Sequence, residues 1–227
     1  MLLNNLSTFA VKLNLITETT WNYNCFIIKR IFMTAACYLN KEKIGNLLIY
    51  IASNIKPLYH TQLLKLIYLI DEEAVKEDGV PITWLDYKVW KFGPVAQEAY
   101  DLKSGSSFNE YVNLILKSGV QDMTNTIIEP AKDFDDAEFS EFEMEIIDRV
   151  LKKYKHYNSA KLVELTHRSD SLWSITKDEH NLDFIDSNTS DHIIDFTRLL
   201  NNDEIKYDNY NGAKETMMFN SQLQPCR

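Results

Sequence analysis

Apolar residues recur at helical spacing in several stretches of the chain, and the first stretch begins near Lys43. Its apolar positions, three, four and seven residues apart, are Ile44, Leu47, Leu48, Ile51 and Ile55. This period predicts a helix with one buried face, and Pro57 ends it because proline cannot continue a helix. A second helix is predicted to begin at Thr61, a suitable N-cap, and to end before Gly79, with Asp71–Glu73 on its solvent side. Its buried face is expected to hold Leu63, Leu66, Ile67, Ile70 and Ala74.

The strongest local signal for a helix lies in the second half of the chain. Ser140 and Glu143 form an S-x-x-E capping box, which predicts a helix that continues through Tyr154. Ser159 is a suitable cap for the next helix, and Ser190 for a last one with the sequence DHIIDFTRLL. These segments favour a mainly helical fold.

The middle of the chain gives weaker signals. The segment ITWLDYKVW is rich in aromatic and branched residues, so it is either a short strand or a buried turn. Gly93 and Pro94 predict a helix start, because proline at the first helical position loses no hydrogen bond. A further helix is expected over residues 108–117. Residues 119–138 lack a helical period and predict an extended or hairpin-like insertion.

These elements predict one mainly α domain, with α+β character allowed through a short strand or hairpin, over residues 41–200. Residues 1–32 show no clear period, and Met33 precedes a stretch that looks like a fresh start. That leader is either a mis-assigned upstream extension or a partner-binding arm. Residues 201–227 are polar without an apolar stripe, which predicts a flexible tail.

Composition and charge narrow the class of protein. A hydrophobic fraction of 45% suits a globular domain, and the net charge of −9 disfavours general binding to nucleic acid while suiting a basic protein partner. No apolar run is long enough for a membrane span, and the start lacks the features of a secretory signal. Cys25, Cys37 and Cys226 form no CxxC pair, so we expect free thiols in a reducing cytoplasm.

Catalytic, metal and cofactor motifs are not found in the sequence. The five histidines lack HExxH spacing, and no phosphate-binding glycine loop or GxSxG elbow occurs. The acidic runs Asp71–Glu73 and Asp133–Asp136 are interpreted as solvated surfaces rather than cation sites. His167 and Trp173 are either a functional pair near a groove or, as we favour, a hydrogen-bonded core histidine beside a buried indole. The aromatic segment over residues 90–94 is either a recognition surface or a packed turn.

Two motifs resemble the Panacea (SocA-like) antitoxin domain. The strings LLKLIY and YKVWKFGPVAQEAYDLK are similar to that family's KL-x-KL-x-Y helix, its W-K-F/Y-G-P-V segment and the following helix with a tyrosine. The matching positions are Lys65, Tyr68, Trp90, Lys91, Phe92, Gly93, Pro94, Val95 and Tyr100. Downstream, SAKLVELTHRSDSLW is similar to the family's S-A-x-x-L-x-x-L-S/T-H motif, which is followed by a tryptophan. Here the matching positions are Ser159, Ala160, Leu162, Leu165, Thr166, His167 and Trp173. The resemblance covers about residues 41–200.

The resemblance implies a cytoplasmic antitoxin of a bacterial or prophage toxin–antitoxin system, which binds and neutralises a toxin encoded next to it. The acidic charge suggests that this toxin is basic. A second hypothesis is an adaptor that delivers a toxin or another client to an ATP-dependent protease. A third, from another class, is an enzyme with its site near His167 and Trp173. The resemblance implies neither a catalytic residue nor a metal or cofactor.

Overall fold

The computed structural model describes residues 40–116, 126–200 and 203–223. The chain divides into two compact units, Asn40–Lys214 and a second unit made of Met1–Leu39 and Glu215–Arg227. Within the second unit the structure describes only residues 215–223, which are helical. The predicted leader and all three cysteines lie outside the described residues.

The structure is mainly helical with short antiparallel strands, as the sequence predicts. The helices are α2 (Lys41–Asn54), α3 (His60–Asp78), α4 (Gln97–Tyr100), α5 (Glu141–Tyr154), α6 (Ser159–Thr166), α7 (Leu172–Glu179) and α8 (Glu204–Leu223). The strands are β1 (Leu58–Tyr59), β2 (Tyr87–Trp90), β3 (Gly93–Ala96), β4 (Val112–Leu116) and β5 (Thr126–Pro130). Short 3-10 helices span Asp101–Ser104, Ser107–Glu110 and Phe196–Leu200. No helix of the described ranges has the length and apolar character needed to cross a membrane.

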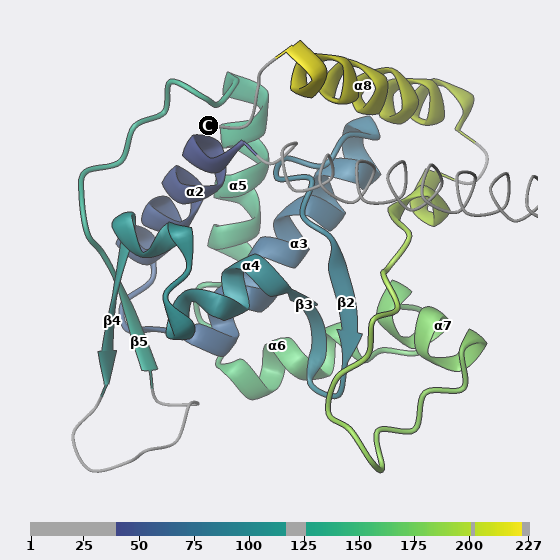
Figure 1. Cartoon of the computed structure of the whole chain (residues 1–227), viewed down its shortest axis with the longest axis horizontal. Helices are drawn as coiled ribbons and strands as arrows, with labels where there is room; N and C mark the ends of the chain where they lie inside the picture. The colour runs from purple at the N-terminus through teal and green to yellow at the C-terminus, as the bar shows by residue number, and fades with distance from the viewer. Residues whose placement is uncertain (1–39, 117–125, 201–202, 224–227) are drawn as a thin grey trace, which may run out of the picture. The chain divides into compact units, whose positions relative to one another are not determined.

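Helix α3 is the centre of the first unit. It contacts α2, α5, α6 and strand β3, and Figure 1 shows it passing between the α2–α5 side and the β2–β3 hairpin. The five apolar residues predicted for its buried face are all in the core. The helix begins at His60 rather than after Thr61, because Tyr59 is the N-cap and Gln62 Oε1 accepts a hydrogen bond from the Tyr59 amide at 2.9 Å. Gly79 ends it at φ 88°, a backbone angle that glycine adopts without strain.

The strands form two small antiparallel sheets. One has the order β1-β5-β4, with Leu58 opposite Ile128 and Leu114 opposite Ile128 on its other side. Within the predicted insertion, Thr126–Pro130 is extended and pairs with β4, which precedes the insertion, while residues 131–138 belong to no helix or strand. The predicted helix over residues 108–117 is wrong, because Val112–Leu116 pairs with β5 and only Ser107–Glu110 is helical.

Strands β2 and β3 form the second sheet, and here the predicted helix start at Gly93 and Pro94 is wrong. Trp90 pairs with Gly93 across a two-residue turn, and Gly93 has φ 100°, which lies outside the helical region. Pro94 is tolerated because β3 is an edge strand. The helix begins only at Gln97 and lasts one turn.

The predicted helix after Ser190 is also wrong over its first half. The chain there runs antiparallel to β2: the Val89 amide donates to His192 O at 2.9 Å, and the Ile194 amide to Tyr87 O at 2.8 Å. The Ser190 hydroxyl donates to Val89 O at 2.6 Å instead of capping a helix. Only Phe196–Leu200 is helical, as a 3-10 turn. Long-range hydrogen bonds to β2 thus override the local helical period.

Helix α8 occupies most of the segment for which the sequence predicted no element. Its first turns are tied to the end of α3: Lys206 Nζ donates to Lys76 O at 2.7 Å and Asn209 Nδ2 to Asp78 O at 3.1 Å. The Tyr210 ring lies 5.3 Å from that of Trp84. These contacts are polar or aromatic. The sequence of α8 therefore lacks the row of aliphatic residues at helical spacing from which a helix is predicted.

Asp71 is the largest departure from the predicted polarity of α3. The sequence placed it on the solvent side, but it is fully buried. Oδ1 accepts from the amides of Ile82 and Thr83 at 2.8 and 2.9 Å, while Oδ2 accepts from the hydroxyls of Thr83 and of Tyr87, the latter at 2.7 Å. Burial raises the pKa of Asp71, and the hydrogen bonds oppose that rise. Asp71 thus fixes the connection between α3 and β2.

Replacing Asp71 tests that role. We expect Asp71→Ala to lower the free energy of unfolding by about 3–5 kcal/mol, because each buried donor left without an acceptor costs about 1–3 kcal/mol. Asp71→Asn is the matched control: its oxygen still accepts from both amides, and the two hydroxyls can rotate to accept from its nitrogen. Urea unfolding of both variants measures the difference, and equal losses would contradict the accounting.

Candidate interaction site at the β2–β3 turn

The residues of the two sequence motifs meet at the turn between β2 and β3. The turn consists of Lys91 and Phe92, and the main-chain carbonyls around it point toward side chains of α3, α6 and α7. An isolated turn would leave these carbonyls to water. Here three side chains from distant parts of the chain, Lys65, His167 and Trp173, lie within hydrogen-bond distance of these carbonyls.

Lys65, on α3, holds the β3 side of the turn. Its side chain is 1% exposed, and Nζ donates to Pro94 O at 2.7 Å. Desolvation lowers the pKa of Lys65 to about 7. A Cβ at Gly93 would lie 2.9 Å from this Nζ and 2.8 Å from Thr166 Oγ1, so only glycine fits between them. The first motif thus supplies both the lysine and the glycine that makes room for it.

His167 and Trp173, from the second motif, hold the β2 side. Trp173 is 5% exposed, and its indole nitrogen donates to Trp90 O at 2.9 Å. His167 Nε2 lies 3.1 Å from Lys91 O, and its Nδ1 lies 2.6 Å from Val163 O. The two rings contact each other with centroids 3.8 Å apart. Both side chains therefore position the turn.

The remaining aromatic residues of the motifs extend the same packing. Trp90 stacks edge-on with Tyr100 at 4.7 Å, and its indole nitrogen donates to Ser190 O at 3.1 Å. Tyr68 lies on α3 between the rings of Tyr87 and Phe196, at centroid distances of 5.2 and 5.8 Å. Val95 is buried in β3. These contacts join the hairpin, α3 and the segment after Ser190 into one packed cluster.

Lys91 and Phe92 are the two residues of the first motif that the packing leaves at the surface. Both are exposed, and Phe92 retains 60% of its accessible area. Gly93 and Pro94 are packed, as the packed-turn alternative predicts, while Lys91 and Phe92 are presented to solvent.

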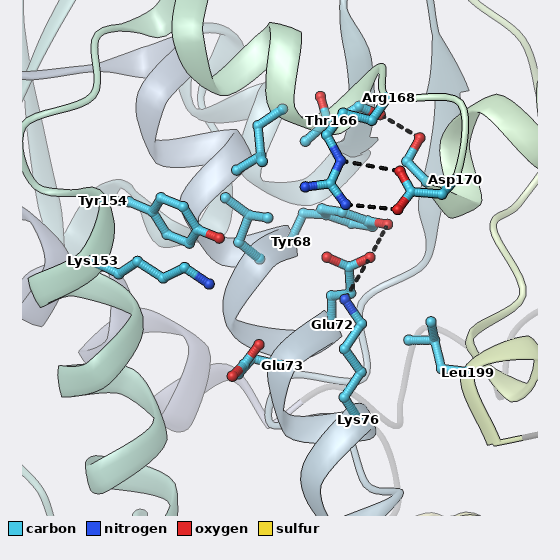
Figure 2. Close-up of a pocket in the computed structure, with 13 residues that line it drawn as sticks. Tyr68, Glu72, Glu73, Lys76, Lys153, Tyr154, Thr166, Arg168, Asp170 and Leu199 are labelled. Carbon is cyan, nitrogen blue, oxygen red and sulfur yellow. Dashed lines mark hydrogen bonds and ion pairs between the residues drawn. The ribbon is translucent and has the colours of Figure 1, made fainter.

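A pocket of about 290 Å³ lies next to this cluster, between α3, α5 and the loop after α6 (Figure 2). Its charges are largely paired with each other: Lys76 with Glu72 at 3.3 Å, and Arg168 with Asp170 at 2.8 Å. The Arg168 guanidinium lowers the pKa of Asp170.

The hydroxyls of the pocket are also occupied. Thr166 Oγ1 donates to Val163 O at 3.0 Å, and Ser171 Oγ donates to Thr166 O at 2.8 Å. Thr166 Oγ1 also lies 3.4 Å from Nδ1 of the adjacent His167. Across the described ranges, His, Cys, Asp and Glu side chains form no group of three that could hold a metal ion.

The buried amine of Lys65 gives the folded protein a specific pH dependence. Its pKa is about 7 when folded against an ordinary value of 10.5, so between these values the unfolded chain binds more protons. Stability should therefore rise with pH in this window, by up to about 1.4 kcal/mol per pH unit from this group. Lys65→Met should lack that component. Urea unfolding of both proteins from pH 7 to 10 measures it, and parallel curves would argue against a lowered pKa.

Trp173 is expected to be a structural anchor. Trp173→Ala should cost about 3–5 kcal/mol, because deleting a buried indole leaves a cavity, and that is a large share of the roughly 5–15 kcal/mol that stabilises a domain. Trp173→Phe keeps a ring but removes the donor to Trp90 O, so its loss should be smaller. Thermal melting compares them, and an unchanged melting temperature for Trp173→Ala would move this side chain from the core to a binding role.

Comparison with known proteins assigns the region that contains this site. The family described as antitoxin SocA-like, Panacea domain, matches residues 63–174. Antitoxin SocA from Caulobacter vibrioides (strain NA1000 / CB15N) is 26% identical over 138 residues, which cover 60% of this chain and 70% of that protein. No solved structure matches the chain. The matched region runs from α3 to α7 and includes all three side chains that hold the turn, so residues 63–174 of this chain are similar to the Panacea domain of the SocA-like antitoxins.

Proposed function

We propose that this protein is an antitoxin that binds a cognate protein toxin and neutralises it by direct contact. The observation that carries the proposal is the match to the Panacea domain, which includes the β2–β3 hairpin and the side chains that contact its turn. Antitoxin SocA of Caulobacter vibrioides, to which the chain is similar, is named as an antitoxin. The polar atoms of Lys65, His167 and Trp173 contact main-chain carbonyls of the turn. These side chains therefore support the turn as a structural platform, which favours a binding role.

The charge of the chain supports a basic toxin. A net charge of −9 attracts a positively charged partner over a distance of about 10 Å at moderate salt. Charge complementarity of this kind raises the association rate and rejects partners of like charge. We therefore place the toxin among basic proteins and expect it to be encoded beside this chain.

The two modes of antitoxin action make different demands. Neutralisation by occlusion needs only a stable complex, because the bound toxin is inactive. Delivery to an ATP-dependent protease needs the protease as a third component. We propose occlusion, because it needs only the two proteins in contact, and a turn with an exposed aromatic side chain offers a surface for that contact.

Co-expression tests this function. The product of the adjacent reading frame, expressed alone, should arrest growth, and co-expression of this chain should restore it and yield a co-purifying complex. Occlusion predicts the same rescue in a host that lacks its ATP-dependent proteases. Rescue that disappears in that host would replace occlusion by delivery, and continued arrest without a complex in either host would overturn the antitoxin proposal.

A further inference from the structure

The β2–β3 turn presents an aromatic side chain on a rigid support. Phe92 is 60% exposed, while the carbonyls of Trp90 and Pro94 on either side of it accept hydrogen bonds from the buried side chains of Trp173 and Lys65, and His167 Nε2 lies 3.1 Å from Lys91 O. An aromatic side chain has few rotatable bonds, and a fixed main chain has little freedom left to lose on binding. Exposed aromatic residues of this kind often dominate the energy of an interface.

An acidic segment, residues 178–195, lies against this hairpin. It contains six acidic residues and neither lysine nor arginine. The amide of Lys91 donates to Asn188 O at 2.9 Å, and Ile193 forms a bridge with Lys88 on β2. Figure 1 shows the chain after α7 returning along β2. The turn and the acidic segment are therefore parts of one surface.

The side chains of the acidic segment are available to a partner. Ile185 is 80% exposed and Ile193 49%. Three of its acids pair with cations of neighbouring segments: Asp178 with Lys177, Glu179 with Arg198, and Asp191 with Lys88. The other three acids, Asp183, Asp186 and Asp195, have no ion-pair partner among the residues that the structure describes. The surface thus combines apolar side chains with unpaired negative charge.

We propose that the Lys91–Phe92 turn and the acidic segment form the surface that binds the toxin, and that the contacted part of the toxin is a basic segment with apolar side chains. This inference rests on the proposed antitoxin function. Phe92, Ile185 and Ile193 supply the apolar contact, and Asp186 with its neighbours supplies the complementary charge. The pocket beside α3 is a poorer fit to a basic partner, because its acidic side chains Glu72, Glu73 and Asp170 are already paired with Lys76, Arg149 and Arg168.

Variants of the full chain test the surface against the purified toxin encoded by the adjacent reading frame. Phe92→Ala should bind about 30-fold more weakly, equivalent to about 2 kcal/mol, with an unchanged melting temperature because the side chain is mostly in solvent. Phe92→Glu should bind more weakly still. Phe142→Ala is the matched control: Phe142 is 42% exposed in the first turn of α5, where the neighbouring Glu143 pairs with Lys43 of α2. It should bind like the wild type.

Asp186→Lys tests the charge independently of the hairpin. Its association rate should fall about tenfold at low salt and approach the wild-type rate as salt increases, because screening removes the attraction that the wild type gains. Wild-type affinity in both Phe92 variants, or an Asp186→Lys rate equal to that of the wild type at every salt concentration, overturns the assignment of the surface while leaving the antitoxin function intact. A wild-type chain that neither binds nor neutralises this toxin overturns both.

Discussion

A two-residue turn exposes main-chain carbonyls that need hydrogen-bond donors, and the packing of this protein is arranged around supplying them. Lys65, His167 and Trp173 come from three different helices or helix ends, yet their polar atoms converge on three carbonyls within five residues, those of Trp90, Lys91 and Pro94. Burying an amine is costly unless it is hydrogen-bonded. The carbonyl of Pro94 meets that need for Lys65, so the turn and the core stabilise each other. Loss of either partner would leave a buried polar group unsatisfied.

This dependence explains which parts of the fold were predictable. The faces of α3 and α5 follow from apolar period, and the capping box of Ser140 and Glu143 forms as expected, because these signals are local. Asp71, by contrast, is an acid at a helical position next to two other acids. Its burial depends on donors in residues 82–87 that no local pattern links to it.

The candidate site shows the same division between local and long-range information. The motifs identified Lys65, His167 and Trp173, but not that these side chains bind a single turn. Gly93 and Pro94 are compatible with a helix start and with a hairpin, and the observed hairpin depends on long-range contacts such as the hydrogen bond from Lys65 to Pro94 O. Ser190 likewise has the right chemistry for an N-cap but uses its hydroxyl on β2. The glycine at position 93 was the one sequence feature that favoured the hairpin, because glycine adopts positive φ angles readily, and Gly93 has φ 100° in the structure.

The β2–β3 hairpin is closed to main-chain pairing along both edges. Residues 188–194 already bond to the outer edge of β2, while on β3 Pro94 has no amide hydrogen and its carbonyl is held by Lys65. A partner cannot extend this sheet by adding a strand. Any partner that binds at the hairpin therefore has to contact its side chains. Side chains at an exposed turn can be exchanged without disturbing the donors beneath them. The architecture therefore separates the buried groups that keep the hairpin folded from the two side chains, Lys91 and Phe92, that it presents to solvent.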